Sequence, residues 1–292
     1  MSVKIKPMIR EILSTISPKV TSKILYRSAF GKKLDLKNPK TLNEKLMWLK
    51  LNSYYNNPLI TTCADKYKVR NYIKELGYEE ILNELIGCWD NTEEIEWDKL
   101  PDKFVLKCNH GAGYNLICQD KKNFNIDEAK RKLNNWLKED YWKKRAELNY
   151  KFIDKKIICE KFIETHDGKL PADYKLYCFN GKPDCVMVCL DREKGKPRLF
   201  FFNRDWKLLD YTSDSIESPN DYLVEKPEGI DKMFEYAEIL SKPFPFVRVD
   251  FYLNSGKVIF GELTFTPGAA LYSNILPKAD DIFGKKIKLP NY

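Results

Sequence analysis

Two carboxylates near the carboxyl end of the chain have the types and spacing expected of a divalent-metal site. Asp250 and Glu262 lie in the segment FVRVDFYLNSGKVIFGELT, residues 246–264, on either side of Asn254-Ser255-Gly256. A β-hairpin is predicted here, because a three-residue loop ending in Gly suits a type I turn followed by a left-handed residue. Magnesium binds to one or two carboxylates together with phosphate oxygens. The pair therefore indicates a magnesium site beside a phosphorylated substrate.

The expected loop length sets the register of this hairpin. It pairs Asp250 with Phe260 and Arg248 with Glu262, so that Asp250 and Glu262 become diagonal neighbours. Because side chains alternate along a strand, Arg248, Asp250 and Glu262 share one face, where Arg248 would neutralise further anionic charge. The same pattern also fits a surface ion pair between Arg248 and Glu262 with a solvated Asp250.

A second candidate site surrounds Lys107, which ends the apolar run FVLK. Residues 109–113 predict a hairpin tip, where backbone amides at Gly111 and Gly113 can approach a phosphate closely. The spacing is neither a P-loop nor a GxGxxG turn, so the loop also fits an ordinary turn. His110 has no visible partner and is interpreted as non-catalytic.

Asp173, Lys175 and Tyr177 form a further polar line, because alternate residues of the segment DYKLYCF face the same side of a strand. These side chains would point into a cleft if that face of the sheet borders one. The exposed face of an antiparallel sheet carries the same alternation, so the pattern is also typical of a solvated surface.

The first part of the chain, which must carry these sites, is predicted to be mostly helical. Apolar residues at helical spacing indicate one helix over residues 7–25. Thr41 and Glu44 form a capping-box pattern at the start of a second helix. A third helix is expected over residues 65–76 and ends at Gly77, a natural carboxyl-terminal cap.

After Pro101 the sequence becomes rich in short β-type runs. FVLKC and YNLIC predict a hairpin around the glycine-containing loop. A charged helix is expected over residues 127–147, followed by strands separated by turns such as Asn180-Gly181, with one helix near residues 229–241. The last third is thus predicted to be an antiparallel sheet, which gives an α+β protein.

Composition excludes several classes of protein. The 292 residues are enough for two or three structural units, and 43% hydrophobic with 32% charged residues is typical of a folded protein. No apolar run approaches the roughly 20 residues of a membrane helix, and no signal peptide is visible, so a cytoplasmic protein is expected. Eight cysteines without a CxxC pair, and only two histidines, argue against a zinc site and for reduced thiols.

The net charge of +8 favours an anionic partner. The lysines are scattered and no nucleic-acid motif is present, so no nucleic-acid partner is expected and an acidic or phosphorylated small molecule fits better. The amino-terminal helix combines apolar residues such as Met8 and Ile12 with basic neighbours. It is interpreted as a peripheral helix packed on the protein, with loose attachment to an anionic membrane surface as the alternative.

In their order along the chain, these segments resemble the ATP-grasp superfamily over about residues 63–277. DKYKVRNYIKELG, FVLKCNHGAGYNLI and ICEKFIE resemble its phosphate-binding helix, its glycine loop and its hinge, and RVDFY with FGELTFTPGAAL resembles its closing hairpin. NPKTLNEKLMWLK resembles the TupA-like ATP-grasp family of surface-polysaccharide biosynthesis, and the motifs are also similar to those of D-alanine-D-alanine ligase. Four motifs in the required order are more specific than any one of them.

The resemblance implies roles in binding ATP. Lys66 and Lys107 would reach the phosphates, and Gly111 and Gly113 would close over the nucleotide. The hinge would border adenine, partly through backbone groups, and consists of Glu160, Lys161, Phe162 and Ile163.

The resemblance also implies roles on the following strands. Asp173 would lie near the ribose and Lys175 near the phosphates. Arg248 would stabilise the transferring charge, and Asp250 and Glu262 would bind Mg²⁺. Ligases of the superfamily usually have Asn two residues after the glutamate, whereas this chain has Thr264, a weaker ligand that leaves the second metal position open.

The implied fold is an ATP-grasp fold, with two α+β lobes whose antiparallel-rich sheets clamp the nucleotide. The expected divisions are a mostly helical region over residues 1–98, a small lobe with the glycine-rich hairpin over 99–163, and a larger lobe with the metal-binding hairpin over 164–292.

The implied activity is that of an ATP- and Mg²⁺-dependent carboxylate-amine ligase, which forms an acylphosphate during capsular or cell-wall polysaccharide biosynthesis. Its partners would be an acidic sugar or polysaccharide acceptor and an amine. A glycan kinase or another transferase, and a non-catalytic nucleotide-binding assembly protein, are the alternatives. The acceptor itself is not fixed by the sequence, because substrate pockets are built from loops.

Overall fold

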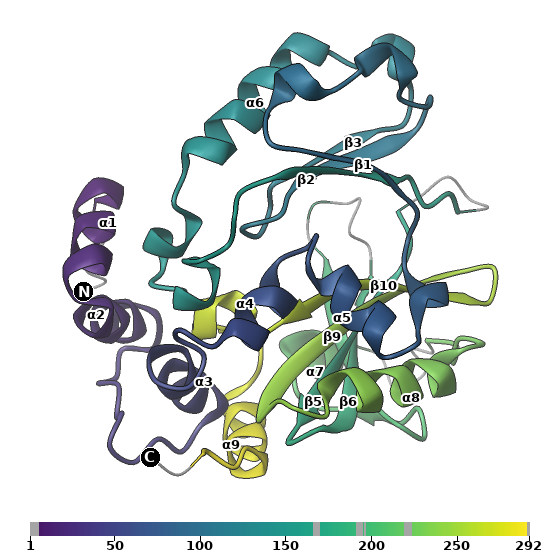
Figure 1. Cartoon of the computed structure of the whole chain (residues 1–292). Helices are drawn as coiled ribbons and strands as arrows, with labels where there is room; N and C mark the ends of the chain where they lie inside the picture. Colours follow the sequence, from purple (N-terminus) through teal and green to yellow (C-terminus); the bar gives the residue numbers. More distant parts are fainter. Residues whose placement is uncertain (1–5, 166–169, 191–194, 196, 219–223, 291–292) are drawn as a thin grey trace.

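Two antiparallel sheets, one above the other in Figure 1, organise the molecule. The computed structural model describes residues 6–165, 170–190, 195, 197–218 and 224–290. The smaller sheet has the strand order β1 (Leu85–Trp89), β4 (Ile157–Lys161), β2 (Phe104–Cys108) and β3 (Asn115–Cys118). The larger sheet has the strand order β10 (Lys257–Thr264), β9 (Phe246–Asn254), β5 (Asp173–Phe179), β6 (Lys182–Leu190), β7 (Arg198–Asn203) and β8 (Leu208–Leu209).

Helices surround the two sheets. In the described part of the chain, five α-helices precede the glycine-containing hairpin, namely α1 (Pro7–Ile16), α2 (Pro18–Phe30), α3 (Leu42–Leu51), α4 (Pro58–Ala64) and α5 (Val69–Glu75). Four follow it, namely α6 (Ile126–Lys138), α7 (Ser213–Glu217), α8 (Ile230–Ser241) and α9 (Pro277–Lys286). The mostly helical first part and the antiparallel last third are therefore confirmed. The proposed division at residues 98 and 163 stays a prediction, and β1, which precedes residue 98, pairs with β4 in the smaller sheet.

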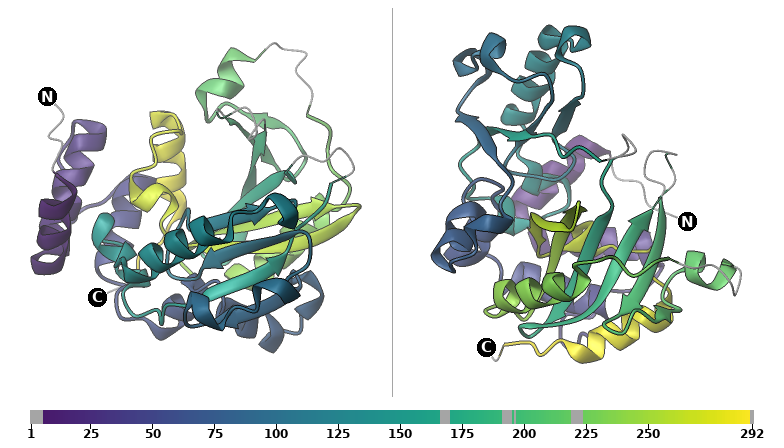
Figure 2. Two further views of the ribbon diagram at one scale, coloured as in Figure 1. Left: turned by 90° about the horizontal axis from the view of Figure 1, so that it is seen from above. Right: turned by 90° about the vertical axis from the view of Figure 1, so that its right-hand side faces the viewer.

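The expected helix over residues 7–25 is two helices. Ser17 has a non-helical conformation, with φ −147° and ψ 87°, because the residue before a proline is disfavoured in the helical region. Its side chain then accepts a hydrogen bond from the Val20 amide at the start of α2. Figure 2 shows α1 and α2 at one edge of the molecule, away from both sheets.

Capping explains where the next helices begin. The predicted capping box is present, since Thr41 Oγ1 accepts from the Glu44 amide and Glu44 Oε2 accepts from the Thr41 amide. The helix expected from residue 65 begins later, at Val69, because the Asp65 carboxylate accepts from the amides of residues 67 and 68 and forms a separate turn.

The charged helix expected over residues 127–147 is shorter than predicted. It ends at Lys138, and two 3-10 turns follow, η5 (Tyr141–Lys144) and η6 (Leu148–Tyr150). Ala146, between them, has a φ of 53°, a left-handed conformation that a continuous helix does not allow.

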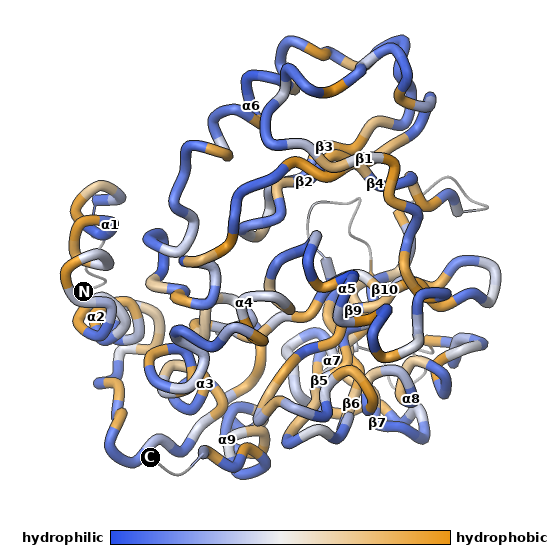
Figure 3. Tube along the Cα trace, in the orientation of Figure 1, coloured by the Kyte–Doolittle hydropathy of each residue, from blue (hydrophilic) through white to orange (hydrophobic). Residues whose placement is uncertain are grey.

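Each sheet has its own apolar packing. In the smaller sheet, Phe104 and Leu106 pack with Leu133 of α6, which lies over the sheet in Figure 1. Figure 3 shows hydrophobic colour along the strands of both sheets. In the larger sheet, α8 packs against β5, β6 and β9, and α9 contributes Phe283, whose ring stacks on Tyr177 with centroids 5.3 Å apart. These helices leave one end of the larger sheet open toward the smaller one.

Candidate active site

The hairpin of β9 and β10 forms as predicted, but with a different register. Its turn is the two-residue segment Ser255-Gly256, whose φ values of 49° and 76° are left-handed, as in a type I′ turn. A bulge at Gly261 then adds one residue to β10, so that Glu262 lies directly opposite Asp250. The expected pairing of Asp250 with Phe260 is therefore wrong, and the two carboxylates are direct cross-strand neighbours.

Arg248 binds Asp250 in a bidentate pair. Its Nε lies 2.7 Å from Asp250 Oδ1, and one of its terminal nitrogens lies 2.6 Å from Oδ2. The same terminal nitrogen donates to Thr264 at 3.1 Å and approaches Glu262 at 3.5 Å. The ion pair to Glu262 considered from the sequence is thus present, but Asp250 is buried rather than solvated.

The three polar residues predicted to share one face of β5 do not all have the same surroundings. Lys175 lies opposite Asp250 and donates to its Oδ2 at 2.8 Å, and it also forms an ion pair with Asp173. Tyr177 shares their face of the strand but is fully buried under Phe283 of α9. Only Asp173 and Lys175 therefore face the open end of the sheet.

Lys66 extends from the turn that precedes α5. The buried Asn109 fixes this turn, since its side chain donates to Asp65 at 2.9 Å and its carbonyl accepts from the Lys66 amide. Lys66 Nζ donates to the Gly111 carbonyl at 2.5 Å and lies 3.8 Å from Glu262 Oε2. One lysine thus connects the glycine-containing loop to the hairpin of the larger sheet.

Lys107 lies on β2 and pairs with Glu160 of the neighbouring strand β4 at 2.5 Å. Arg70 of α5 lies 3.6 Å from the other oxygen of Glu160. The predicted hinge glutamate is therefore held by two cations. Arg70 was not predicted, although it follows Lys66 by four residues in the same motif.

A cavity of 240 Å³ lies between the two sheets where these side chains converge. Seven predicted residues line it: Lys66, Lys107, Gly113, Asp173, Lys175, Asp250 and Glu262. Gly111, Arg248 and Thr264 are absent from its lining. Gly111 packs against the Tyr141 ring, and its carbonyl accepts a hydrogen bond from Lys66.

A smaller and more apolar cavity of 80 Å³ continues from the first. The predicted hinge residues Glu160, Lys161, Phe162 and Ile163 line it. Tyr252 and Asn115 line both cavities and were missed by the sequence analysis. Their signals were available, because Tyr252 follows Asp250 by two residues on one strand and Asn115 begins the strand that pairs with Lys107.

The surrounding charges control the protonation of Glu262. Burial by itself would raise its pKa, but the positive charges of Lys66, Arg248 and Lys175 outweigh burial and lower the pKa to about 2. Burial lowers the pKa of Lys66, with Glu262 acting in the opposite direction. Glu262 therefore stays anionic at neutral pH and is available to a cation.

His110 is structural, as interpreted from the sequence. It is buried, and its Nε2 donates to the Trp136 carbonyl of α6 at 3.1 Å. Burial is the main cause that lowers its pKa to about 4, so it is neutral at pH 7.

The oxygen donors of this site fit one magnesium ion that also binds phosphate. Among the described residues, no three acidic, histidine or cysteine side chains gather into a metal cage. Asp250 and Glu262 nevertheless face the larger cavity together, and magnesium commonly uses two carboxylates with phosphate oxygens and water. Thr264 Oγ1 already bonds to Arg248 and to Glu262, which leaves it a minor role at most.

The family of the chain follows from a match over most of its length. The model of the TupA-like ATP-grasp family matches residues 44–288. The chain belongs to the TupA-like ATP-grasp family. The ATP-grasp fold expected from the order of the motifs is therefore confirmed.

Solved structures similar to this TupA-like chain are ATP-grasp ligases. The D-alanine-D-alanine ligase of Bacillus anthracis complexed with ATP is 17% identical with a TM-score of 0.47, over 85% of this chain and 66% of that one. A second structure of that ligase is 20% identical with a TM-score of 0.43, over 76% and 63%. The L-amino acid ligase of Bacillus licheniformis is 14% identical with a TM-score of 0.44, over 78% and 49%.

The TupA-like chain thus spans less than two thirds of the length of these three ligase chains. No curated protein matches it.

Proposed function

We propose that this protein is an ATP-dependent carboxylate-amine ligase. The observation that supports this function best is the 240 Å³ cavity, in which lysines from both sheets surround two adjacent carboxylates. Lys107 comes from the smaller sheet, Lys175 from the larger sheet and Lys66 from the turn between them. Cations in a partly desolvated cleft interact strongly with a polyphosphate, and the neighbouring apolar cavity suits the base of a nucleotide.

Each cation of the site is paired with a carboxylate of the protein. Lys107 pairs with Glu160, and Lys175 pairs with Asp173 and Asp250. Phosphate oxygens of ATP would compete for these ammonium groups, whose three N–H donors let them bind both partners. Magnesium held by Asp250 and Glu262 would supply further positive charge to the phosphates.

In the proposed reaction, a carboxylate oxygen of the acceptor attacks the γ-phosphorus of ATP, and the bond from that phosphorus to ADP breaks. Lys66, Lys107 and Lys175 would hold the phosphates in line and stabilise the charge on the transferring oxygens. The amine then attacks the acylphosphate carbon, a C–N bond forms, phosphate leaves and the amine loses a proton. The products are an amide, ADP and phosphate.

We propose an acidic sugar, free or within a surface polysaccharide, as the carboxylate substrate. A uronate supplies the carboxylate that acylphosphate chemistry needs, and the net charge of +8 favours an anionic acceptor. The TupA-like resemblance supports the same choice. We also propose that the protein acts in the cytoplasm, with weak attachment of α1 to the inner membrane face.

The direct test is to incubate the purified full chain with ATP, MgCl₂, a uronate and a set of amines. Release of ADP and phosphate, with an amide detected by mass spectrometry, is expected. A phosphorylated sugar without amide would select a glycan kinase instead. If ATP neither is consumed nor raises the melting temperature, as a ligand of the folded state must, the nucleotide site itself is refuted.

A matched pair of variants ties this activity to the cleft. Lys107→Met is expected to remove most turnover and most of the thermal shift caused by ATP, because it deletes a phosphate-facing cation. Lys103→Met is the control, since Lys103 lies just before the same strand, has a side chain that is 42% exposed and pairs with Glu164 outside both cavities. Equal loss in both variants would show that Lys107 has no specific role.

A further inference from the structure

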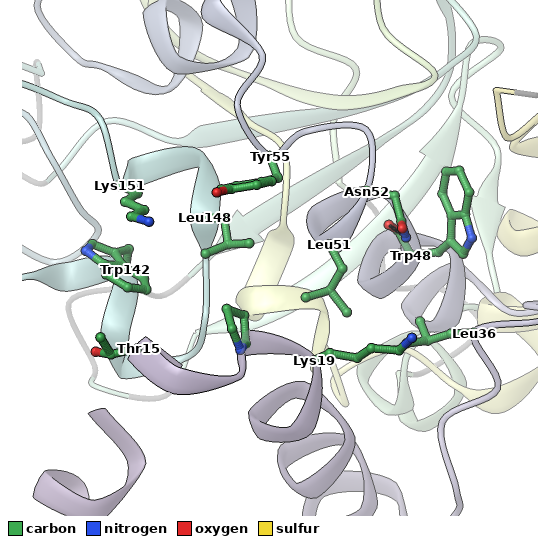
Figure 4. A pocket seen from close by; sticks show the side chains of 11 residues that line it. Thr15, Lys19, Leu36, Trp48, Leu51, Asn52, Tyr55, Trp142, Leu148 and Lys151 are labelled. Carbon is green, nitrogen blue, oxygen red and sulfur yellow. Dashed lines mark hydrogen bonds between the residues drawn. The ribbon is translucent and has the colours of Figure 1, made fainter. Parts of the chain in front are cut away.

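A third cavity, of 370 Å³, lies where the α1–α2 pair meets α3 and the segment after α6 (Figure 4). Its walls are Thr15, Pro18, Lys19, Leu36, Trp48, Leu51, Asn52, Tyr55, Trp142, Leu148 and Lys151. None of these residues lines either cavity of the cleft. The volume falls within the range of about 300 to 1,000 Å³ that is usual for small-ligand pockets.

The lining combines aromatic rings with cations and contains no carboxylate. Trp48, Tyr55 and Trp142 supply the rings, and the ammonium of Lys151 lies 5.2 Å from the centre of the Trp142 ring and 5.8 Å from that of Tyr55. Among the described residues, no ion pair joins Lys151 or Lys19 to an acidic side chain. Nearby lysines differ, since Lys143 pairs with Asp140. The pocket is therefore electropositive.

Two neutral polar groups complete the lining. Asn52 donates its amide nitrogen to the Trp48 carbonyl at 2.7 Å, which leaves its side-chain oxygen as an acceptor. Thr15 donates its hydroxyl to the Glu11 carbonyl at 2.9 Å, which leaves the hydroxyl oxygen as an acceptor. The pocket thus offers cations for a carboxylate, acceptors for hydroxyl groups and π-faces for apolar C–H surfaces.

We infer that this pocket binds one or two residues of an acidic saccharide. A pyranose ring has C–H faces that pack on aromatic rings, hydroxyl groups at its edge and, in a uronate, one carboxylate. Each of these groups has a counterpart in the lining. A purely apolar ligand or a neutral sugar would leave both ammonium groups without an anionic partner.

A hydrogen bond links the segment that lines the pocket to the residues just after the strand that carries Glu262. Trp142 and Leu148 lie on the segment that also carries Glu147, which accepts a hydrogen bond from Thr266 at 2.8 Å. Thr266 follows β10, the strand of Glu262, by two residues. A saccharide in the pocket would therefore be held at a fixed position relative to the cleft. The assignment of this saccharide to the acceptor substrate rests on the proposed function. The binding of a saccharide in the pocket does not depend on it.

Binding can be measured by calorimetry on the full chain with trigalacturonate, with maltotriose as the neutral saccharide of equal length. Trigalacturonate is expected to bind, and maltotriose to bind at least about tenfold more weakly, because it lacks the charge-assisted bonds. Equal affinity for the two, or no binding of trigalacturonate, would overturn the inference.

Variants locate the binding. Lys151→Ala and Tyr55→Ala change exposed side chains and are each expected to weaken trigalacturonate binding by about tenfold. Lys138→Ala, an exposed lysine of α6 outside all three cavities, is the control. Unchanged affinity in both pocket variants would place the saccharide elsewhere and refute the proposed site.

The same variants separate this inference from the proposed ligase activity. Lys107→Met should leave trigalacturonate binding intact while it removes the response to ATP. Saccharide binding without ATP turnover would refute the ligase and preserve the pocket. If the full chain does not bind trigalacturonate, and Lys151→Ala does not change its turnover of a uronate, the pocket is refuted and the ligase is preserved.

Discussion

Three positively charged side chains surround the Glu262 carboxylate. Lys66 and Arg248 approach it from two elements, and Lys175 adds a third positive charge from β5. Its side chain is nevertheless 36% exposed toward the cleft, so it can exchange a protein cation for another cation. The Asp250 side chain is only 4% exposed, between Arg248 and Lys175, and this small exposed part lines the cavity.

The depressed pKa of Glu262 makes a pH-dependent contribution to stability. Its pKa is about 2 in the folded protein against an ordinary 4.5, so the unfolded chain takes up its proton first as the pH falls. The contribution is complete above about pH 4.5 and is lost progressively toward about pH 2. In urea titrations across this window, Glu262→Gln should lose less stability than the native chain. Glu75→Gln, on the exposed end of α5, should lose as much stability as the native chain does. If the free energy of unfolding of all three proteins falls equally with pH, Glu262 is not the source of the pH dependence.

At the scale of elements, a buried lysine joins segments that lie far apart in the sequence. Lys50 of α3 is the clearest example, since its fully buried ammonium donates to the carbonyl of Arg145 at 3.1 Å and to that of Ala269 at 3.5 Å. Buried Glu147 lies nearby and compensates its charge. This cluster joins α3 to the segment after α6 and to the segment that follows β10.

Lys50→Met should destabilise the protein by about 3 to 5 kcal/mol in urea denaturation at neutral pH, because it leaves Glu147 buried without its counter-charge. Burial raises the pKa of Glu147, so the folded state binds this proton more tightly than the unfolded chain. The loss should therefore shrink as the pH falls from neutral toward 4.5. Lys50→Met combined with Glu147→Gln should recover part of the stability, and no recovery would contradict the charge explanation.

Gly284 lets α9 pack closely against the start of α3. A Cβ at this position would lie 2.1 Å from the Lys40 carbonyl oxygen and 2.6 Å from the Thr41 Cα. Gly284→Ala should therefore lower the free energy of unfolding by about 1 kcal/mol or more, because the backbone clash exceeds the helix-propensity gain of alanine. Urea denaturation measures it, with exposed Lys285→Ala as the control. A higher free energy of unfolding for Gly284→Ala would show that α9 can shift away from residues 40 and 41 without destabilising the protein.

At the scale of the whole molecule, the amino-terminal helices present an apolar surface that the described part of the chain does not cover. Met8 is 71% exposed, Ile12 53% and Ile16 76%, on α1 at the edge of the molecule (Figure 3). Lys19 follows on the exposed part of α2. Among the described residues, no helix has the length and apolar composition needed to cross a bilayer. An apolar face with basic neighbours suits attachment to the surface of an anionic membrane.

The full chain should co-sediment with vesicles that contain phosphatidylglycerol and much less with phosphatidylcholine alone, and salt should weaken the binding. Ile16→Asp should reduce binding by about tenfold or more, because it removes a large apolar side chain from the interface. Ile216→Asp is the matched control, since Ile216 is 60% exposed on α7. Equal sedimentation of the two variants would exclude α1 as the attachment site.

The sequence by itself determined the local features and predicted several of the residues that line the cleft. The capping box at Thr41, the left-handed turn at Asn180-Gly181 and the hairpin that carries Lys107 depend on neighbouring residues, so their patterns predict them directly. The order of the ATP-grasp motifs also selected seven of the twelve residues that line the 240 Å³ cavity, because that order reflects the fold of a family.

The tertiary structure alone decided the arrangement of those residues. The bulge at Gly261 moved Glu262 opposite Asp250, α9 covered Tyr177, and the backbone of Gly111 turned its carbonyl toward Lys66. The pocket between α1, α3 and the segment after α6 likewise joins residues more than a hundred positions apart. Such features depend on which distant surfaces pack together, and local sequence patterns carry no direct record of that packing.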